Sequence, residues 1–248
     1  MIHMAIRFLY VFFLLIFFSV KFINAQENQI ITNKLNENGQ KVGKWEVYYE
    51  NTKQLRYIGQ FENDKPTGNF IYYYPSGSFS ANMNYKNDSI SYVVHYHENG
   101  NFMGAGKFIN QKKDSIWVLY NKQGELVSKS TYRLGVLTGN QEVYYPVNIR
   151  EEEKIAERYF IDNGSKHGKW EQFFTDGKIK ASGNYIKGSK NGEFIYYIGD
   201  SIVEMKGTYI NDLKEGKWYY FNSESKESDE VYYIKGKSVK DDLEIKNE

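Results

Sequence analysis

A repeated pattern of about 24 residues constrains this chain more than any other feature of its 248 residues. Its opening part is Gly-x-Trp-x-x-Tyr, clearest in "VGKWEVYY" (42–49) and "HGKWEQFF" (167–174). The pattern begins eight times, and successive starts are 25, 23, 24, 24, 29, 24 and 24 residues apart. The eight starts are 43, 68, 91, 115, 139, 168, 192 and 216. Self-similarity at such a period indicates a repeat architecture in which each unit packs against its neighbours.

A second aromatic follows each start after 17 to 20 residues. These aromatics are Phe61, Tyr85, Phe108, Tyr132, Tyr159, Tyr185, Tyr209 and Tyr233. Turn sequences such as "HENG" (97–100) and "TDG" (175–177) separate the two parts of a unit, and Asn-Gly and Asp-Gly are strong hairpin signals. The segments between turns are five to seven residues long and rich in Tyr, Phe, Trp, Val and Ile, which is typical of strands.

The sequence therefore predicts an all-β fold: an antiparallel meander of about sixteen strands, two per unit, in one elongated single sheet. We expect three segments: a signal peptide at 1–25, the repeat domain at 26–237 and a charged tail at 238–248.

This pattern resembles the MORN-repeat family in its bacterial variant form. The residues that carry the resemblance are "NGQKVGKWEVYY" (38–49) and "KHGKWEQFFTDGKI" (166–179), and it extends from about 35 to 233. The match departs where the Trp or Phe becomes Val93 or Gln141, and where the Gly becomes Ser91 or Ser115. The resemblance implies a repeat scaffold without catalytic residues. Some family members are proposed to bind membrane lipids, and related bacterial proteins are named YwqK-like antitoxins.

Strand alternation places an aromatic row on each face of the predicted sheet. One face carries the Trp or Phe of the pattern, and the other carries the aromatic five residues after each start. The second row is Tyr48, Tyr73, Tyr96, Tyr120, Tyr144, Phe173, Tyr197 and Phe221. A Tyr row either packs across neighbouring strands or binds an extended partner, because Tyr combines rigid area with a polar tip. Packing is the simpler interpretation, and we expect binding where the repeat departs from its own pattern.

The N-terminus reads as an export signal. Residues 8–20 are uncharged and apolar, Arg7 precedes them, and Ala25 offers a small residue for cleavage. An uncleaved anchor is the alternative. The chain has no Cys, which excludes a disulfide framework and a lipidated cysteine. These features predict an exported protein that is periplasmic, outer-membrane-associated or extracellular.

Charge and motifs argue against several functions. The net charge of +1 lacks the excess of Lys and Arg that nucleic-acid binding needs. No nucleophile elbow, Walker loop or dinucleotide fingerprint is present. His95 and His97 could begin a metal site, but zinc needs three or four ligands, so we expect no metal and no cofactor. Glu151, Glu152 and Glu153 lie in the one long insertion, where a solvated turn or extended hairpin is the simpler interpretation.

We therefore expect a non-catalytic binding protein, not an enzyme, with another protein as its partner. One alternative is an antitoxin or immunity protein that binds a toxin. Another is recognition of glycan or lipid head groups through the aromatic rows. A third is a hydrolase that uses the insertion around Glu151.

Overall fold

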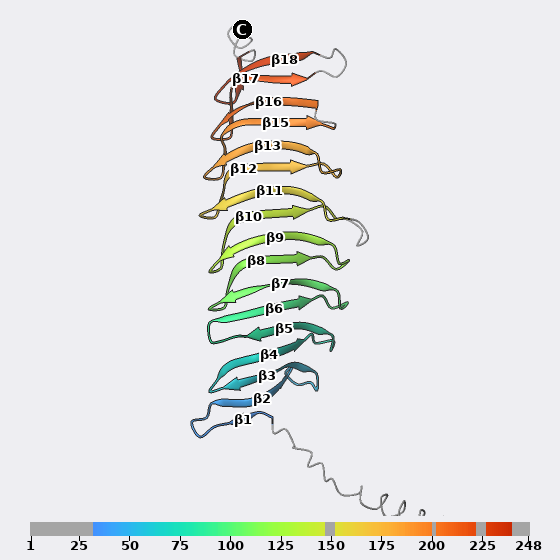
Figure 1. Cartoon of the computed structure of the whole chain (residues 1–248), viewed down its shortest axis with the longest axis vertical. Coiled ribbons are helices and arrows are strands. Elements are labelled where there is room, and N and C mark those ends of the chain that lie inside the picture. The colour runs from blue at the N-terminus through green and yellow to red at the C-terminus, as the bar shows by residue number, and fades with distance from the viewer. Residues whose placement is uncertain (1–31, 147–151, 200–201, 222–226, 240–248) are drawn as a thin grey trace, which may run out of the picture. The chain divides into compact units, whose positions relative to one another are not determined.

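The computed structural model describes residues 32–146, 152–199, 202–221 and 227–239 (Figure 1). The chain divides into two units, Met1–Thr32 and Asn33–Glu248. The predicted signal peptide at 1–25 lies outside the described residues, as does the charged tail from residue 240 onward. All the strands belong to the second unit.

The described residues form nineteen strands and no helical element. The first strands of the eight repeat units are β2 (Lys41–Tyr48), β4 (Lys65–Tyr73), β6 (Ile90–Tyr96), β8 (Lys112–Tyr120), β10 (Val136–Tyr144), β12 (Ser165–Phe173), β15 (Gly192–Ile198) and β17 (Leu213–Phe221). The second strands are β3 (Leu55–Glu62), β5 (Phe79–Tyr85), β7 (Phe102–Ile109), β9 (Leu126–Arg133), β11 (Ile155–Asp162), β13 (Ile179–Ile186), β16 (Ile202–Ile210) and β18 (Ser228–Ile234). Three two-residue strands complete the set: β1 (Lys34–Leu35), β14 (Ser189–Lys190) and β19 (Lys237–Ser238).

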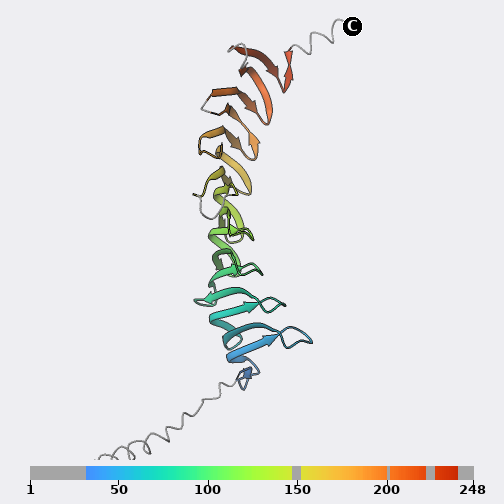
Figure 2. The same cartoon turned by 90° about the vertical axis from the view of Figure 1, so that its right-hand side faces the viewer.

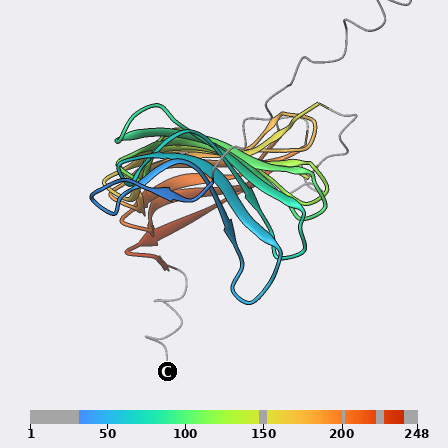
Figure 3. The same cartoon turned by 90° about the horizontal axis from the view of Figure 1, so that it is seen from below.

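These strands form one open antiparallel sheet that follows the chain order (Figure 1). Each strand pairs with the next, except that β14 and β15 both pair with β13 on either side of Asn191. The strand direction turns progressively along the sheet, as the views in Figures 2 and 3 show, which is the ordinary twist of β-structure. The predicted meander of two strands per unit is confirmed.

The opening residue of seven of the eight units adopts a left-handed backbone conformation at a break in the strand pairing. Six of these residues are glycines, with φ between 64° and 88°. They are Gly43, Gly68, Gly139, Gly168, Gly192 and Gly216. Ser115 keeps the same conformation at φ 61°, although a side chain there costs about 1–2 kcal/mol.

Unit three begins without a left-handed residue and without a break in the strand pairing. Ser91 is not among the residues with positive φ, and β5 pairs with β6 without the register shift seen between β7 and β8 or between β11 and β12. The preceding spacing of 23 residues fits this difference, because a strand without a bulge needs one residue fewer.

The core lies on the face that carries the third residue of each unit, which we call the Trp face. Its central residues are Trp45, Phe70, Val93, Trp117, Gln141, Trp170, Phe194 and Trp218; all but Trp45 are buried. No second layer covers this face within the described ranges, so burial has to come from the sheet itself.

Glycines in the second strands make this burial possible. Phe70 lies over Gly59, Trp117 over Gly106, Phe194 over Gly183 and Trp218 over Gly207. A Cβ atom at any of these glycines would come within 2.1–2.3 Å of the ring above it. The indole can therefore lie against the backbone, where Nε1 of Trp117 donates to the carbonyl of Lys107 and Nε1 of Trp218 donates to that of Thr208, both at 3.1 Å.

Unit five departs from this arrangement, and one sequence-based assignment there is wrong. Gly139 pairs with Ile161 in the way that Gly43 pairs with Phe61, so the core position is held by Ile161 and not by Tyr159. The reason is that all five extra residues of this unit lie in the hairpin between β10 and β11, which moves the position from 17 to 22 residues after the start. Tyr159 instead occupies the glycine slot opposite Trp170.

Two core residues next to this change make other contacts than their counterparts do. Trp170 cannot lie over a glycine, and its Nε1 donates to Oε1 of Glu157 at 2.6 Å instead of to the backbone. Gln141 stands where a Trp would be, opposite Ser130. Its amide donates to the carbonyl of Thr131, the residue after Ser130, and to that of Thr138. Gln141 therefore makes the backbone hydrogen bond that Trp117 and Trp218 make in their units.

Candidate functional site

The aromatic row expected to bind lies on the face opposite the Trp face, at the hairpin end of the first strands. Tyr48 is 48% exposed, Tyr144 is 8% exposed, and the others are half-buried. The half-buried members are Tyr73, Tyr96, Tyr120, Phe173, Tyr197 and Phe221. Most members of the row are therefore only partly accessible.

Much of this row packs within the sheet. Phe79 and Phe102, at the starts of second strands, alternate with the row's tyrosines in units two to four. Phe79 lies 4.8 Å from the ring of Tyr96, and Phe102 lies 5.0 Å from the ring of Tyr120. Tilted and edge-to-face contacts of this kind stabilise neighbouring strands by about 0.5–1.5 kcal/mol each. The packing role of the row is clear here, and binding by it stays a prediction.

In units one, two, three and five, the side chain that follows the row member ties one unit to the next. The hydroxyl of Tyr49 donates to the carbonyl of Tyr73, and Tyr74 and Tyr145 make the same bond to the next unit, at 2.6–2.8 Å. In unit three the ring Nε2 of His97 lies 2.9 Å from the carbonyl of Tyr120. His97 therefore takes a structural position of the repeat. Across the described ranges, no group of three or more His, Asp or Glu side chains could hold a metal ion.

The insertion is only partly described. Residues 147–151, which include Glu151, lie outside the described residues. Glu153 pairs with Lys129 at 3.3 Å, and Glu157 and Arg158 belong to strand β11. Arg158 and Lys169 bind the buried carboxylate of Glu171 on the face opposite the Trp face, at 2.9 and 2.6 Å. Burial raises the pKa of Glu171, but the hydrogen bonds from Lys169 and Arg158 lower it more, so the pKa lies below its ordinary value.

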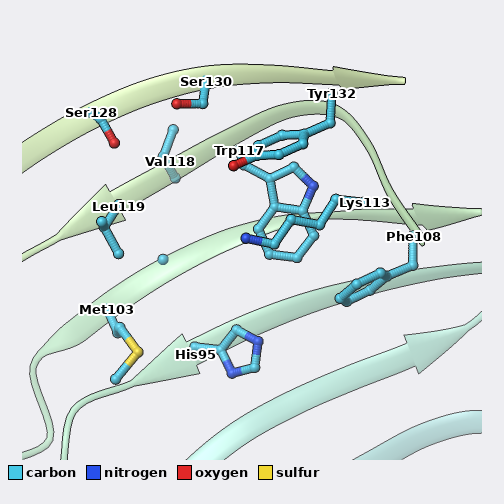
Figure 4. Close-up of a pocket in the computed structure, with 11 residues that line it drawn as sticks. His95, Met103, Phe108, Lys113, Trp117, Val118, Leu119, Ser128, Ser130 and Tyr132 are labelled. Atoms are coloured by element: carbon cyan, nitrogen blue, oxygen red, sulfur yellow. The ribbon is translucent and has the colours of Figure 1, made fainter. Parts of the chain in front are cut away.

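A pocket of about 230 Å³ opens on the Trp face in units three and four (Figure 4). Its lining comes from β6, β7, β8 and β9, and the side chain of Lys113 reaches across the indole of Trp117. The other lining residues are His95, Met103, Gly104, Phe108, Val118, Leu119, Ser128, Ser130 and Tyr132. The pocket therefore lies among the units in which the repeat departs from its pattern.

Small side chains create this pocket. Leu119 stands where units two, seven and eight carry Tyr72, Tyr196 and Tyr220. On β9, Ser128 aligns with Leu119 across the sheet, and Ser130 aligns with Trp117. Leu119 lacks the phenol ring of the tyrosines that it replaces, and the two serines of β9 are too short to fill that space, so the surface is hollow between Trp117 and Leu119.

Lys113 belongs to a series of lysines that cover the aromatic rings of the Trp face. Its ammonium lies 4.5 Å from the Trp117 ring and 5.1 Å from the Tyr132 ring. Three members of the series have an acceptor: Lys190 and Lys214 donate to the hydroxyls of Tyr196 and Tyr220, and Lys166 binds Glu157 at 2.6 Å, whereas Lys41 over the Trp45 ring has none among the described residues. Leu119 offers Lys113 no acceptor, and no other described residue supplies one.

Three further polar groups at the pocket have no hydrogen-bond partner among the described residues. They are the imidazole of His95 and the hydroxyls of Ser128 and Ser130. Burial, and then the charge of Lys113, lower the pKa of His95 below its ordinary value of 6.5. Lys113 is the one lysine or arginine among the described residues that line the pocket.

The reverse side of the same units presents an exposed apolar patch, formed by Tyr92, Val94, Ala105, Ile116 and Val118. Ile116 is 63% exposed and Tyr92 is 47% exposed. Both stand one residue after the unit start, where units one, six and eight carry Lys44, Lys169 and Lys217. A shallow depression lies over the patch. Units three and four are therefore unusual on both faces.

Comparison with models of protein families finds no match, and no curated protein matches the chain. In the part of the chain that the structure describes, no helix is long and apolar enough to cross a membrane.

Apart from His95, the residues of the pocket and the patch were not among those that the sequence marked as candidates for binding a ligand, a metal or a partner. The signal for the patch was present, because Tyr92 and Ile116 replace polar residues at one repeat position. The pocket depends on which side chains meet across strands, and alignment of the units alone does not give that register.

Proposed function

We propose that the protein is an exported, non-catalytic scaffold of the bacterial envelope that binds another protein through the apolar patch on β6, β7 and β8. The observation that carries the proposal is the exposure of Ile116 and Tyr92 at positions that are charged in other units. Contiguous apolar surface rimmed by polar residues is characteristic of protein interaction sites.

The surroundings of the patch support a limited, specific contact. Further along the same face, Arg158, Lys169 and Glu171 form an ion-paired cluster. Such a cluster makes a poor interface centre, because burying its charges costs desolvation energy. An apolar centre beside a charged flank matches the division of protein interfaces into core and rim.

Assignment to the MORN-variant family belongs to the same proposal and rests on the repeat pattern and the two-stranded units. Export rests on the apolar segment 8–20. A toxin is one kind of protein partner that the patch could bind, and the antitoxin alternative is therefore included in the same test. Glycan or lipid recognition by the aromatic row requires accessible ring faces, whereas the rings of Tyr96 and Tyr120 pack against Phe79 and Phe102.

The test compares capture of binding partners by the native protein and by a Tyr92→Lys, Ile116→Lys variant. Lysine occupies this position in three other units, so the variant retains the fold. The matched control is Asn69→Lys, Asn140→Lys, which adds the same charge at the same repeat position in units two and five.

Proteins cross-linked in cells and identified by mass spectrometry give the readout, with circular dichroism as the check on folding. A recurrent partner that the control retains and the patch variant loses supports the proposal. A partner captured equally by both variants, or no recurrent protein partner for the native chain, contradicts it.

A further inference from the structure

We infer that the pocket on the Trp face of units three and four is a binding site for a small carboxylate that carries an apolar group. The inference concerns the face opposite the protein-binding patch and does not depend on the proposed function.

The charge of the pocket selects the class of ligand. Lys113 is a cation without an acceptor among the described residues, and its counterparts Lys190 and Lys214 each donate to a tyrosine hydroxyl. An acceptor brought by a ligand would take the place of the tyrosine that Leu119 replaces. One lysine, without an arginine, suits a singly charged carboxylate better than a phosphate, which is held more often by several charges or a guanidinium fork.

The polar groups around the ammonium would fix the orientation of the ligand's carboxylate. Ser128 and Ser130 can donate from their hydroxyls to a carboxylate that accepts from Lys113, and His95 lies across the pocket from them (Figure 4). All three are without a hydrogen-bond partner among the described residues, so a ligand would satisfy groups that the fold leaves open. Ligand sites typically have a few convergent polar groups in a mostly apolar lining.

The remaining lining sets the size and character of the ligand. Met103, Leu119 and Phe108 give an apolar wall. The volume of about 230 Å³ exceeds the roughly 150 Å³ of a cavity that takes benzene. The site therefore fits a branched or ring-sized apolar group attached to the carboxylate. Both a free short-chain acid and the C-terminal residue of a peptide have this chemistry.

The experiment titrates the purified protein with 4-methylpentanoate and with the peptide N-acetyl-Gly-Leu, each beside its uncharged amide. Binding is followed by the NMR signals of the tryptophan indoles, because Trp117 lines the pocket. Lys113→Met removes the charge, and Lys41→Met is the matched control. Lys41 has the same place in unit one, with its ammonium 4.7 Å from the Trp45 ring, but does not line the pocket.

Leu119→Tyr is a second variant that keeps the test meaningful if Lys113→Met loses structure. It copies Tyr72, Tyr196 and Tyr220, gives Lys113 an acceptor and fills the hollow, so it folds at least as well as the native chain. We expect at least one acid to bind and its amide not to bind. Lys113→Met should weaken binding about tenfold to a hundredfold, since a hydrogen bond to a charged group is lost. Leu119→Tyr should abolish binding and Lys41→Met should leave it unchanged.

The pattern of binding also identifies the source of the carboxylate. Binding of both acids indicates a pocket open to free small acids, and binding of the peptide alone indicates recognition of a chain terminus. Either pattern supports the inference. The inference is overturned if neither acid binds at millimolar concentration, if the amides bind as well as the acids, or if binding survives in Leu119→Tyr.

Discussion

The packing of an indole over a glycine predicts a large effect from one added methyl group. In Gly207→Ala the new Cβ atom would lie 2.3 Å from the ring of Trp218, whereas carbon atoms in contact normally lie about 3.5–4.0 Å apart. The ring must therefore move by more than about 1 Å, although it is fully buried. Overpacking of this kind costs about 1–3 kcal/mol, and loss of the Nε1 bond to Thr208 adds about 1 kcal/mol. We expect a loss of about 2–4 kcal/mol.

The control for this experiment is Ser130→Ala, which holds the same place in unit four. Ser130 already carries a Cβ atom, and the next strand has Gln141 opposite it where Gly207 has Trp218 above it. Urea unfolding of both variants, followed by circular dichroism, measures the difference. A midpoint for Gly207→Ala equal to that for Ser130→Ala would refute the reasoning, because it would mean that the indole does not need the glycine.

Three further predictions follow from the same structure. Ser115→Gly should raise the free energy of unfolding in urea by about 1 kcal/mol, because it removes the strain of a side chain in the left-handed conformation. Gly168→Ser should lower the free energy of unfolding by a similar amount, and equal midpoints for the two variants would contradict this. Burial raises the pKa of Tyr72 above its ordinary value of 10.0. The contribution of this hydroxyl to stability is therefore complete below pH 10 and is lost as the pH rises through the folded-state pKa. Tyr72→Phe should lose less stability above pH 10 than the native chain does, and equal losses would count against a buried hydroxyl. The pKa of Glu171 lies below 4.5, so its contribution to stability is complete above that pH and is lost as the pH falls through the folded-state pKa. Arg158→Met removes one cause of the lowered pKa, so this variant should be less stable than the native chain at neutral pH but should lose less stability on acidification. Equal losses on acidification would show that the ion pair is unimportant.

The regular part of the fold could be read from the sequence because each unit repeats its own turn signals and strand lengths. Two strands per unit and an aromatic row on each face follow from spacing and alternation, whereas the burial of the Trp face is known only from the structure. Tyr159 could not be assigned correctly by counting, because the count does not say where within unit five the five extra residues lie. The glycine bulges, and their absence at Ser91, also needed the pairing register.

The candidate site was predictable only in its approximate location. Binding was expected where the repeat departs from its pattern, and the pocket and the patch both fall in units three and four. The residues that form them could not be predicted, because a pocket forms between strands that are 10 to 20 residues apart in the chain. Lys113, Leu119 and Ser128 become meaningful together only when β8 lies beside β9.

The central claim is that units three and four depart from the repeat in order to bind, and not in order to fold. The most direct test is a variant that restores the repeat on both faces: Tyr92→Lys, Ser115→Gly, Ile116→Lys and Leu119→Tyr. Its urea midpoint and its capture of protein partners are measured beside those of the native chain. We predict a midpoint equal to or above the native value, with loss of the partner. A variant that unfolds more easily, or that still captures the partner, would contradict the claim.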